Sequence, residues 1–570
     1  MRTTATVKGR ARLARGAFLV SAFVFLALFA ASLSAQPRPP HAAIASAHPL
    51  ATEAGFAVLK AGGNAFDAAV AVSAALAVVE PYSSGMGGGG FWLLHRAADG
   101  REVMIDGRER APLGAHAELY LDTDGQVMPD RSINGPLAAA IPGEPAALVH
   151  IAQTYGRLSL PQLLRPAIDL ARDGFEVDAH YQRMAAFRLA VLRDYPAAAR
   201  IFLERGEVPV LDYRLKQPDL AETLESLAAH GRDGFYSGPV ARRLVEGVRK
   251  AGGIWSLEDL ARYRVVERDP IRGDYRGIHI TSASPPSSGG IVLLTMLNIL
   301  ARYPLADLDS ATRVHLMVEA MRRAYRDRAE YLGDPDFVDI PVGRLLHPRY
   351  ADGLRAGIRP DRATPSEWLP GATDVPAGAH TTHFSILDTE GNRVAATASI
   401  NYPFGSGFVV PGTGVLLNDE MDDFSMKPGV PNSYGLIGAT ANAVAPGKRP
   451  LSSMTPTFLD DGTRVAILGT PGGSRIITMV LAATLDFASG ETPKSWVAKR
   501  RFHHQYLPDQ IEFEDGAFSA DVLKGLEQRG HRLNALERPY GNMQAILWNR
   551  ETGEVSAASD PRGRSGAGVR

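Results

Sequence analysis

The chain has 570 residues, of which 45% are hydrophobic and 22% charged, and it carries a formal net charge of −1 and no cysteine. One hydrophobic core rarely supports this length, so two or more packed units are expected, with the composition of a soluble globular protein. The balanced charge argues against nucleic-acid binding, and the missing thiols exclude disulfides, cysteine chemistry and a lipoprotein cysteine.

The first residues have the parts of a secretory signal. Basic residues without any Asp or Glu come first, an apolar run fills Ala17–Leu33, and small residues follow at Ser34 and Ala35. The run is short for a membrane span, which needs about 20 residues. Residues 1–35 are therefore predicted to be a signal peptide of an exported, periplasmic or secreted protein. The alternative is an uncleaved N-terminal segment that anchors the protein to a membrane.

Helices and strands alternate after residue 40. Expected elements are a strand at 42–47, a helix at 50–60, a buried alanine-rich helix at 65–79 and a strand at 91–95. The glycines Gly87–Gly90 lead into that last strand. They lack the Lys-Ser/Thr pair and the following helix of a phosphate loop, so close backbone packing is expected there instead.

The second half of the chain changes in character. Residues 140–330 have mainly amphipathic helical patterns, and residues 358–380, rich in Pro, Gly and Ala, are the best linker candidate. Alternating strand patterns follow at 382–388, 393–400, 464–469 and 544–548, with one helix at 476–485. Helical covers and two strand regions predict a layered α+β protein with sheets in the middle.

Thr381 stands where the linker ends and a strand begins. If the His380–Thr381 bond were cut, Thr381 would carry both a hydroxyl nucleophile and a free α-amine that can act as its base. The next residues predict a hairpin that turns at 390–391, in which the numbers of facing residues sum to about 781. This pairing places Ser399 and Asn401 beside Thr381, on one face of the strand. An ordinary strand start with a polar face is the plainer alternative.

Other polar segments have the chemistry of a ligand site. The segment Asp419–Asp423 holds four carboxylates in five residues and is either a solvated acidic turn, a cation site or a pocket for an amine. Ser452 and Ser453 precede a strand and could bind a carboxylate or cap a turn. The turn at 472–473 precedes a helix and offers backbone N–H groups that suit an oxyanion. Arg108 follows a strand and, taken alone, is a surface arginine.

Together these segments resemble the γ-glutamyltranspeptidase family of N-terminal-nucleophile hydrolases. The similarity runs in one order from about residue 41 to residue 563. The matching segments are HPLATEAG (48–55), EPYSSGMGGGGF (80–91), DGRERAP (106–112), EAMRRAYRDRAEYLGDPDF (319–337), TTHFSILDTEGN (381–392), LNDEMDDFS (417–425), KRPLSSMTPT (448–457), GTPGGSRIIT (469–478), RFHHQYLPD (501–509) and ASDPR (558–562).

The resemblance implies a fold and a maturation step. The fold would be the four-layer αββα sandwich of N-terminal-nucleophile hydrolases. Thr381 Oγ would attack the carbonyl of His380, and hydrolysis of the resulting ester would leave a large subunit, 36–380, and a small subunit, 381–570, as a heterodimer.

The resemblance also assigns residue roles. Thr381 would be the nucleophile with its own amine as base, Ser399 the hydroxyl beside it, and Gly472 and Gly473 the oxyanion hole. Arg108, Ser452 and Ser453 would hold the α-carboxylate of a γ-glutamyl group, Asn401, Glu420 and Asp423 would hold its α-amino group, and Tyr434 would belong to a lid loop at 428–439.

The implied reaction is γ-glutamyl transfer. A γ-glutamyl amide such as glutathione would acylate Thr381, and water or the amine of an amino acid or peptide would take the group; no metal or organic cofactor is implied. A zwitterionic head needs a guanidinium fork for its carboxylate and carboxylates for its ammonium, which the candidate residues supply.

Two alternatives remain open. A glutaryl-type acylase, such as a cephalosporin acylase, shares the fold, but its substrates lack the α-amino group that Asp423, with Glu420 and Asn401, would bind. An unprocessed, non-catalytic binding protein would have no need of the intact Thr381 and Arg108.

Overall fold

The chain is described here from a computed structural model, which covers residues 37–369, 381–427, 429–430, 436, 438–564 and 566–570. Residues 39–570 form one compact unit, and residues 1–38 are a separate one. The predicted signal peptide, His380 and Tyr434 lie outside the described residues. Among those residues, no helix is both long and apolar enough to cross a membrane.

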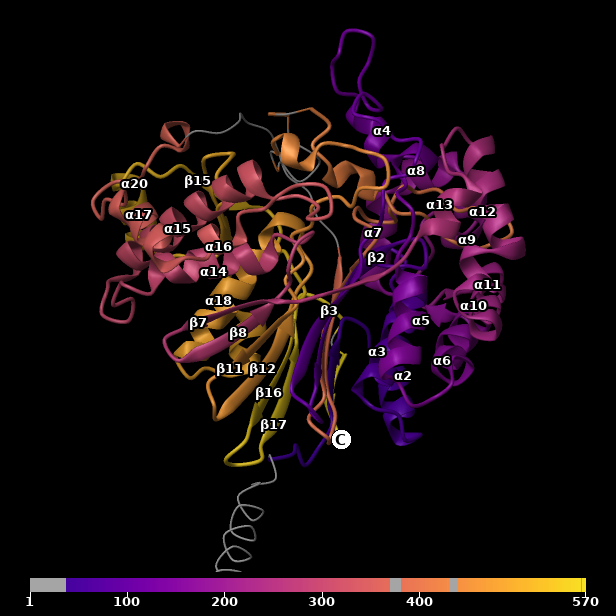
Figure 1. Cartoon of the computed structure of the whole chain (residues 1–570), viewed down its shortest axis with the longest axis horizontal. Coiled ribbons are helices and arrows are strands. Elements are labelled where there is room, and N and C mark those ends of the chain that lie inside the picture. Colours follow the sequence, from indigo (N-terminus) through magenta and orange to yellow (C-terminus); the bar gives the residue numbers. More distant parts are fainter. Residues whose placement is uncertain (1–36, 370–380, 428, 431–435, 437, 565) are drawn as a thin grey trace, which may run out of the picture. The chain divides into compact units, whose positions relative to one another are not determined.

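Two antiparallel sheets form the centre of the compact unit (Figure 1). The first sheet has the order β18 (Gly566–Val569), β1 (Ala43–Ser46), β9 (Thr382–Leu387), β10 (Arg393–Ser399), β2 (Gly89–Arg96), β3 (Arg101–Gly107), β6 (Val266–Arg268). The second has the order β17 (Val555–Ser559), β16 (Gln544–Asn549), β12 (Arg464–Gly469), β11 (Thr457–Asp460), β8 (Ile278–Ser282), β7 (Ile271–Tyr275).

Helices cover the outer face of each sheet, which gives four layers in the order αββα (Figure 1). The first sheet is covered by α2 (Pro49–Lys60), α3 (Ala65–Val79) and α5 (Glu144–Tyr155), and α6 (Leu160–Asp173), α10 (Pro218–His230) and α12 (Gly238–Lys250) extend the same core further out. The second is covered by α14 (Gly289–Leu300), α15 (Ser310–Tyr331) and α18 (Ile476–Ala488). The layered α+β prediction is confirmed.

Shorter elements complete the described chain. The helices are α4 (Pro129–Ile133), α7 (Ala179–Phe187), α8 (Leu189–Asp194), α9 (Pro196–Phe202), α11 (Asp233–Tyr236), α13 (Leu257–Arg262), α16 (Val342–Leu345), α17 (Pro348–Ala356), α19 (Pro493–Ala498) and α20 (Ala520–Gln528). The small sheets are β4 (Phe175–Glu176) with β5 (Arg214–Leu215), and β13 (Phe502–His503) with β14 (Ile511–Glu514) and β15 (Leu533–Leu536).

Strand alternation decides which core each side chain enters. In β9, Phe384 and Ile386 pack against the helices of the first layer, whereas Leu387 belongs to the core between the sheets. Ser385 also points to the second sheet, where its hydroxyl donates to the carbonyl of Gln544 (3.2 Å). A strand between two apolar layers has this pattern because successive side chains point to opposite faces.

The four consecutive glycines pack backbone against backbone, as predicted. A Cβ at any of them would overlap a carbonyl oxygen of a neighbouring segment; those oxygens belong to Leu416, Ser399, Gly107 and Thr397. The segment therefore serves close approach of strands and not phosphate binding. Helix α3 is buried along all of its length, as its alanine-rich sequence predicted.

Two features of the structure add to the sequence expectations. Residues 140–330 contain the short strands β6, β7 and β8. Because they are short, their strand conformation depends more on pairing in the sheets, of β6 with β3 and of β8 with β11, than on their own sequence pattern. The described part of the predicted linker, 358–369, is held in place: the N–H of Thr364 donates to Glu319 (3.0 Å) and that of Ser366 to Asp509 (2.8 Å).

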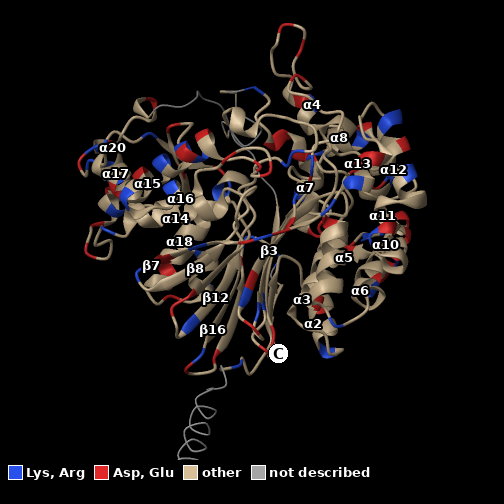
Figure 2. Ribbon diagram, viewed as in Figure 1, with Lys and Arg blue, Asp and Glu red and all other residues tan. Residues whose placement is uncertain are grey.

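Charged residues lie mainly on the covering helices and loops, with Lys and Arg interspersed among Asp and Glu (Figure 2). Few of them lie on the strands between the layers. The sheets therefore form a largely apolar centre, and charges that are buried there stand out as candidates for a site.

The interface between the sheets leaves little space at Gly469, the last residue of β12. A Cβ there would overlap the imidazole of His383 in β9. Gly469→Ala is therefore expected to lower the free energy of unfolding by about 1–3 kcal/mol, measured by urea unfolding. Gly343→Ala is the control, because Gly343 in α16 has open space around it. Equal stability of the two variants would contradict this packing.

Candidate active site

Thr381 lies at the start of β9, with 7% of its surface exposed. Thr382 faces Ala398 in the hairpin, so facing residues sum to 780, one less than expected, and Thr381 comes opposite Ser399. The two hydroxyl oxygens are 3.4 Å apart. The predicted pairing of these residues is confirmed.

Ser399 and Asn401 are held by the chain that follows β10. The backbone N–H of Asn401 donates to the hydroxyl of Ser399 (2.8 Å), which leaves the hydroxyl hydrogen of Ser399 able to point toward Thr381. Asn401 has a positive φ of 72°, and its side-chain amide donates to the carbonyl of Asp419 (3.1 Å). This conformation is uncommon for a residue other than glycine and marks a functional candidate.

Arg108 is fully buried just after β3, contrary to the surface position it would have if taken alone. One terminal nitrogen of its guanidinium is 2.8 Å from a carboxylate oxygen of Glu420, and the other pairs with Asp423. Its Nε donates to the carbonyl of Pro450 (3.1 Å). Arg108, which was predicted to bind the substrate carboxylate, is thus paired with Glu420 and Asp423, which were predicted to bind the substrate ammonium.

Carboxyl groups outnumber guanidinium groups around Arg108. Glu109 lies 3.5 Å from the guanidinium, and burial raises the pKa of Glu109 to about 8 although Arg108 opposes that shift. Burial also raises the pKa values of Glu420 and Asp423, again against the attraction of Arg108. The guanidinium of Arg108 is thus shared by the buried carboxyl groups of Glu109 and Glu420 and the partly exposed one of Asp423, and the guanidinium of Arg328 is also close to Asp423. Such a cluster is stabilised by an additional cation.

Arg328 supports the paired serines and was not predicted as a site residue. Its guanidinium donates to the hydroxyls of Ser453 (3.1 Å) and Ser288 (3.0 Å). Ser288 in turn donates to the carbonyl of Ser452 (2.7 Å). Burial lowers the pKa of Arg328 to about 10. Four arginines fall between residues 322 and 328, and nothing in their sequence separates this one from the others.

Gly472 and Gly473 form the turn before α18. Their φ values of 143° and 55° lie in the region that favours glycine. Gly473 begins a single 3₁₀ turn, Gly473–Arg475, that leads into the helix. Neither backbone N–H donates to another described residue, so both can bind an oxyanion at the positive end of the helix.

The carboxylates of the acidic turn, 419–423, have two roles. Asp419 accepts the backbone N–H of Tyr402 (2.9 Å), and Asp422 accepts the hydroxyl of Ser132 (2.8 Å). These two residues fix the turn. Among the described residues, neither carboxylate oxygen of Glu420 has a well-aligned hydrogen-bond partner. Glu420 can therefore accept hydrogen bonds from a bound ammonium.

The predicted residues surround one small cavity of about 20 Å³, room for about one water molecule. It is lined by Thr381, Ser399, Asn401, Glu420, Asp423, Leu436, Ser452, Ser453, Met454, Gly473, Ser474 and Ile476. Arg108 lies behind Glu420 and Asp423. Apart from Tyr434 and His380, which are not described, the structure brings the predicted residues together.

A wider cleft of about 750 Å³ also reaches Thr381. Thr381, Pro471 and Gly472 line it together with Arg183 and Arg538. Thr381 therefore borders two spaces, a small one next to Glu420 and Asp423 and a much wider one.

A buried cluster outside this site could hold a metal ion by its composition: His315, Glu319 and His531. Its ligand atoms have other partners. The imidazoles of His315 and His531 bind each other (2.8 Å), the second nitrogen of His315 binds the carbonyl of Arg359 (2.8 Å), and Glu319 accepts the hydroxyl of Thr364 (2.6 Å). These bonds account for the cluster without a cation.

Comparison with known proteins agrees with this geometry. The chain matches the family model described as γ-glutamyltranspeptidase over residues 51–569. It is 44% identical to proteins named glutathione hydrolase proenzyme from Pseudomonas sp. (strain A14) and from Escherichia coli, in each case over 92% of this chain and 91% of the relative.

Solved structures give the same fold. A cephalosporin acylase from Bacillus halodurans is similar with a TM-score of 0.81 and 28% identity, over 94% of this chain and 96% of that one. A γ-glutamyltranspeptidase chain from Helicobacter pylori is similar with a TM-score of 0.56 and 41% identity, over 57% of this chain and 94% of that one. The protein thus has the fold of the N-terminal-nucleophile hydrolases.

Within that class, the chain belongs to the γ-glutamyltranspeptidase family, because the family model covers nearly all of it. The relatives named glutathione hydrolase proenzyme match over a similar length.

Glu80 also lines the wider cleft and was not predicted as a site residue. Its carboxylate accepts the hydroxyl of Thr382 (2.8 Å) and, more weakly, that of Tyr82 (3.4 Å). Burial raises the pKa of Glu80 from 4.5 to about 7; the charge of Asp178 adds to the shift, and the hydroxyl hydrogen bonds and Arg564 reduce it.

This shift makes stability depend on pH. The folded state keeps a proton on Glu80 between about pH 4.5 and pH 7 that the unfolded state has lost, so Glu80 destabilises the fold as pH rises across this window. As pH rises from 4.5 to 8, the unfolding free energy of Glu80→Gln should therefore increase by about 3 kcal/mol relative to that of the unmodified protein. Urea unfolding at several pH values measures this difference. The exposed Glu222→Gln is the control. A pH dependence equal to that of the control would contradict the shift.

Proposed function

We propose that the protein is a self-processing γ-glutamyltransferase and glutathione hydrolase. The single observation that carries this proposal is the buried cluster of Glu109, Glu420 and Asp423 around Arg108, next to the hydroxyl of Thr381. An α-amino acid head supplies one carboxylate and one ammonium. It fits a site in which a guanidinium and surplus carboxylates are already paired with one another.

Substrate binding is proposed to replace ion pairs within the protein by ion pairs between the protein and the substrate. The α-carboxylate of the γ-glutamyl group takes the place of a carboxylate on Arg108 and accepts from Ser452 and Ser453. The α-ammonium binds Asp423 and Glu420, with the amide oxygen of Asn401. The small volume of the cavity means that this exchange needs local opening, which the lid segment containing Tyr434 is proposed to govern.

Catalysis is proposed to begin at Thr381. Its Oγ attacks the γ-carbonyl carbon while its α-amine takes the hydroxyl proton and later gives it to the leaving amine. Ser399, 3.4 Å away, orients the attacking oxygen. The N–H groups of Gly472 and Gly473 stabilise the oxyanion, and water or an amine then attacks the γ-glutamyl ester.

The wider cleft is the proposed path for the leaving group and for the acceptor. It is lined by Thr381 and Gly472, and Thr381 is the residue that it shares with the charged cavity. Arg183 and Arg538 line it, and neither has a carboxylate partner among the described residues. These two guanidinium groups suit the carboxylate of an amino acid or dipeptide acceptor.

Cleavage between His380 and Thr381 would produce subunits that stay together. In the first sheet, β1 lies between β18 and β9, and β10 pairs with β2, so strands from before and after the cut are interleaved. Each proposed subunit, 36–380 and 381–570, would lose its ladder partners if they separated, which supports a heterodimer. Residues 1–35 are proposed to direct export.

The first test is the intact mass of the purified, incubated protein. Two fragments are expected, one ending at His380 and one beginning at Thr381, because the hydroxyl of Thr381 attacks the preceding carbonyl. Thr381→Ala should stay uncut, and Thr381→Ser, which keeps a hydroxyl, should be cut. An unmodified chain that stays whole would leave Thr381 without its amine and favour a non-catalytic binding protein.

A glutaryl-type acylase is the second candidate, since the similar structures include a cephalosporin acylase. γ-Glutamyl- and glutaryl-p-nitroanilide differ only in the α-amino group. Asp423→Asn should lower kcat/KM by about tenfold to a hundredfold on the γ-glutamyl substrate, with little change on the glutaryl one.

Asp422→Asn is the matched control, because Asp422 binds Ser132 and is expected to affect both substrates alike. Equal losses of kcat/KM on both substrates in Asp423→Asn would overturn the assignment of Asp423 to the ammonium.

A further inference from the structure

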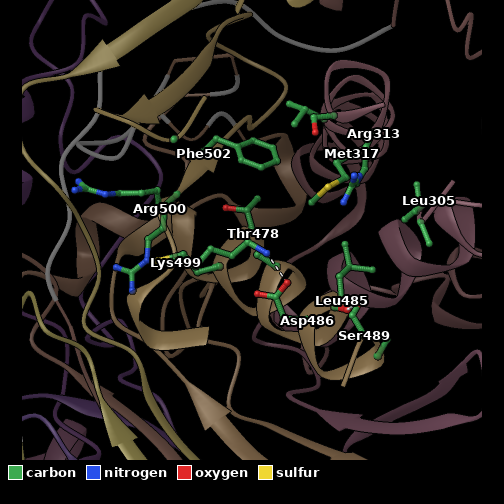
Figure 3. Close-up of a pocket in the computed structure, with 18 of the residues that line it drawn as sticks. Leu305, Arg313, Met317, Thr478, Leu485, Asp486, Ser489, Lys499, Arg500 and Phe502 are labelled. Carbon is green, nitrogen blue, oxygen red and sulfur yellow. Dashed lines mark hydrogen bonds and ion pairs between the residues drawn. The ribbon is translucent and has the colours of Figure 1, made fainter. Parts of the chain in front are cut away.

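A cavity of about 870 Å³ lies away from the predicted residues (Figure 3). It is a groove along the outer face of α18, between the N-terminal half of α15 and the segments 499–502 and 517–522. None of the residues assigned to γ-glutamyl transfer lines it. Its volume falls in the range of small-molecule sites, about 300–1,000 Å³.

Apolar side chains form much of the groove. Phe502 and Met317 lie on facing walls, and Leu485 of α18 lies on the floor (Figure 3). Other apolar residues that line it are Leu305, Val314, Met479, Ala482, Phe518 and Val522. A flat or aliphatic organic body would exchange contact with water for contact with these side chains.

The polar side chains of the groove are mainly cationic. Six arginines and lysines line it, against two aspartates: Arg276, Arg313, Arg464, Lys499, Arg500 and Arg501, with Asp461 and Asp486. The whole chain has a net charge of only −1, so this excess is local.

The two aspartates are already paired, Asp461 with Arg464 (2.7 Å) and Asp486 with Lys499. Arg276, Arg313 and Arg500 have no carboxylate partner among the described residues. A bound anion would supply that partner.

Asp486 gives the groove a further polar feature. One of its carboxylate oxygens binds Lys499, as the dashed line in Figure 3 marks, and the other is buried without a hydrogen-bond partner among the described residues. A buried acceptor without a partner is costly, and an N–H or O–H group of a ligand would satisfy it.

We propose that this groove binds a small organic anion with an apolar body and a hydrogen-bond donor. The apolar body lies over α18 between Met317 and Phe502, the donor faces Asp486, and the anionic group meets the guanidinium of Arg313. This site is independent of γ-glutamyl transfer, because it shares no residue with the proposed donor cavity.

The test uses 8-anilino-1-naphthalenesulfonate, which has an apolar body, one N–H donor and one sulfonate. Isothermal titration and fluorescence with the purified full-length protein should show one site per chain. N-phenyl-1-naphthylamine, the same body without the sulfonate, should bind about tenfold more weakly, because it cannot pair with Arg313. Equal binding of both molecules, or no saturable site, would overturn the proposal.

Two variants locate the site. Arg313→Glu should remove the preference for the sulfonate, and Ala482→Trp should fill the floor and abolish binding of both molecules. Arg242→Glu, an exposed arginine of α12 outside the groove, should leave binding unchanged. Thermal unfolding checks that Ala482→Trp is folded. If Arg313→Glu and Ala482→Trp both bound the probe as the unmodified protein does, the probe would be bound elsewhere, and the proposal would be overturned.

Discussion

The buried guanidinium of Arg108 is the interaction on which the candidate site depends. A charge taken out of water needs partners of opposite sign, and Arg108 finds them in Glu420, Asp423 and Glu109. Glu420 and Asp423 are far from Arg108 in sequence, so their pairing with it joins the end of β3 to the acidic turn. The same pairing leaves more carboxyl groups than guanidinium groups, and the ammonium of a zwitterionic substrate head would favour their ionised form.

The two sheets provide the rigidity that this charge cluster needs. Strands from both sides of the proposed cleavage point alternate in the first sheet, and a common core fills the space between the two sheets. A cut at Thr381 would therefore free one chain end without releasing either fragment. The nucleophile would keep its position because the ladder from Thr382 onward is already formed.

Helix α18 links the catalytic turn to the outer surface. Its N-terminal end follows Gly472 and Gly473, while its outer face forms the floor of the cationic groove. The helix is almost entirely apolar, so packing against the second sheet fixes it, and one face remains to line a cavity. Helix α18 thus borders both the candidate active site and the cationic groove.

Local pattern alone determined much of this protein. Period-two alternation located β9, β10 and β12, the Glu390-Gly391 turn set the hairpin within one residue of its register, and the glycine run predicted close strands. The hairpin and the strand alternation depend on neighbouring residues, and the glycines show close packing whatever segment packs against them. The strands β7 and β8, the burial of Arg108, the role of Arg328 beside Ser453 and the shift of Glu80 were decided by tertiary structure. They depend on desolvation and on partners from distant segments, and no local pattern carries that information.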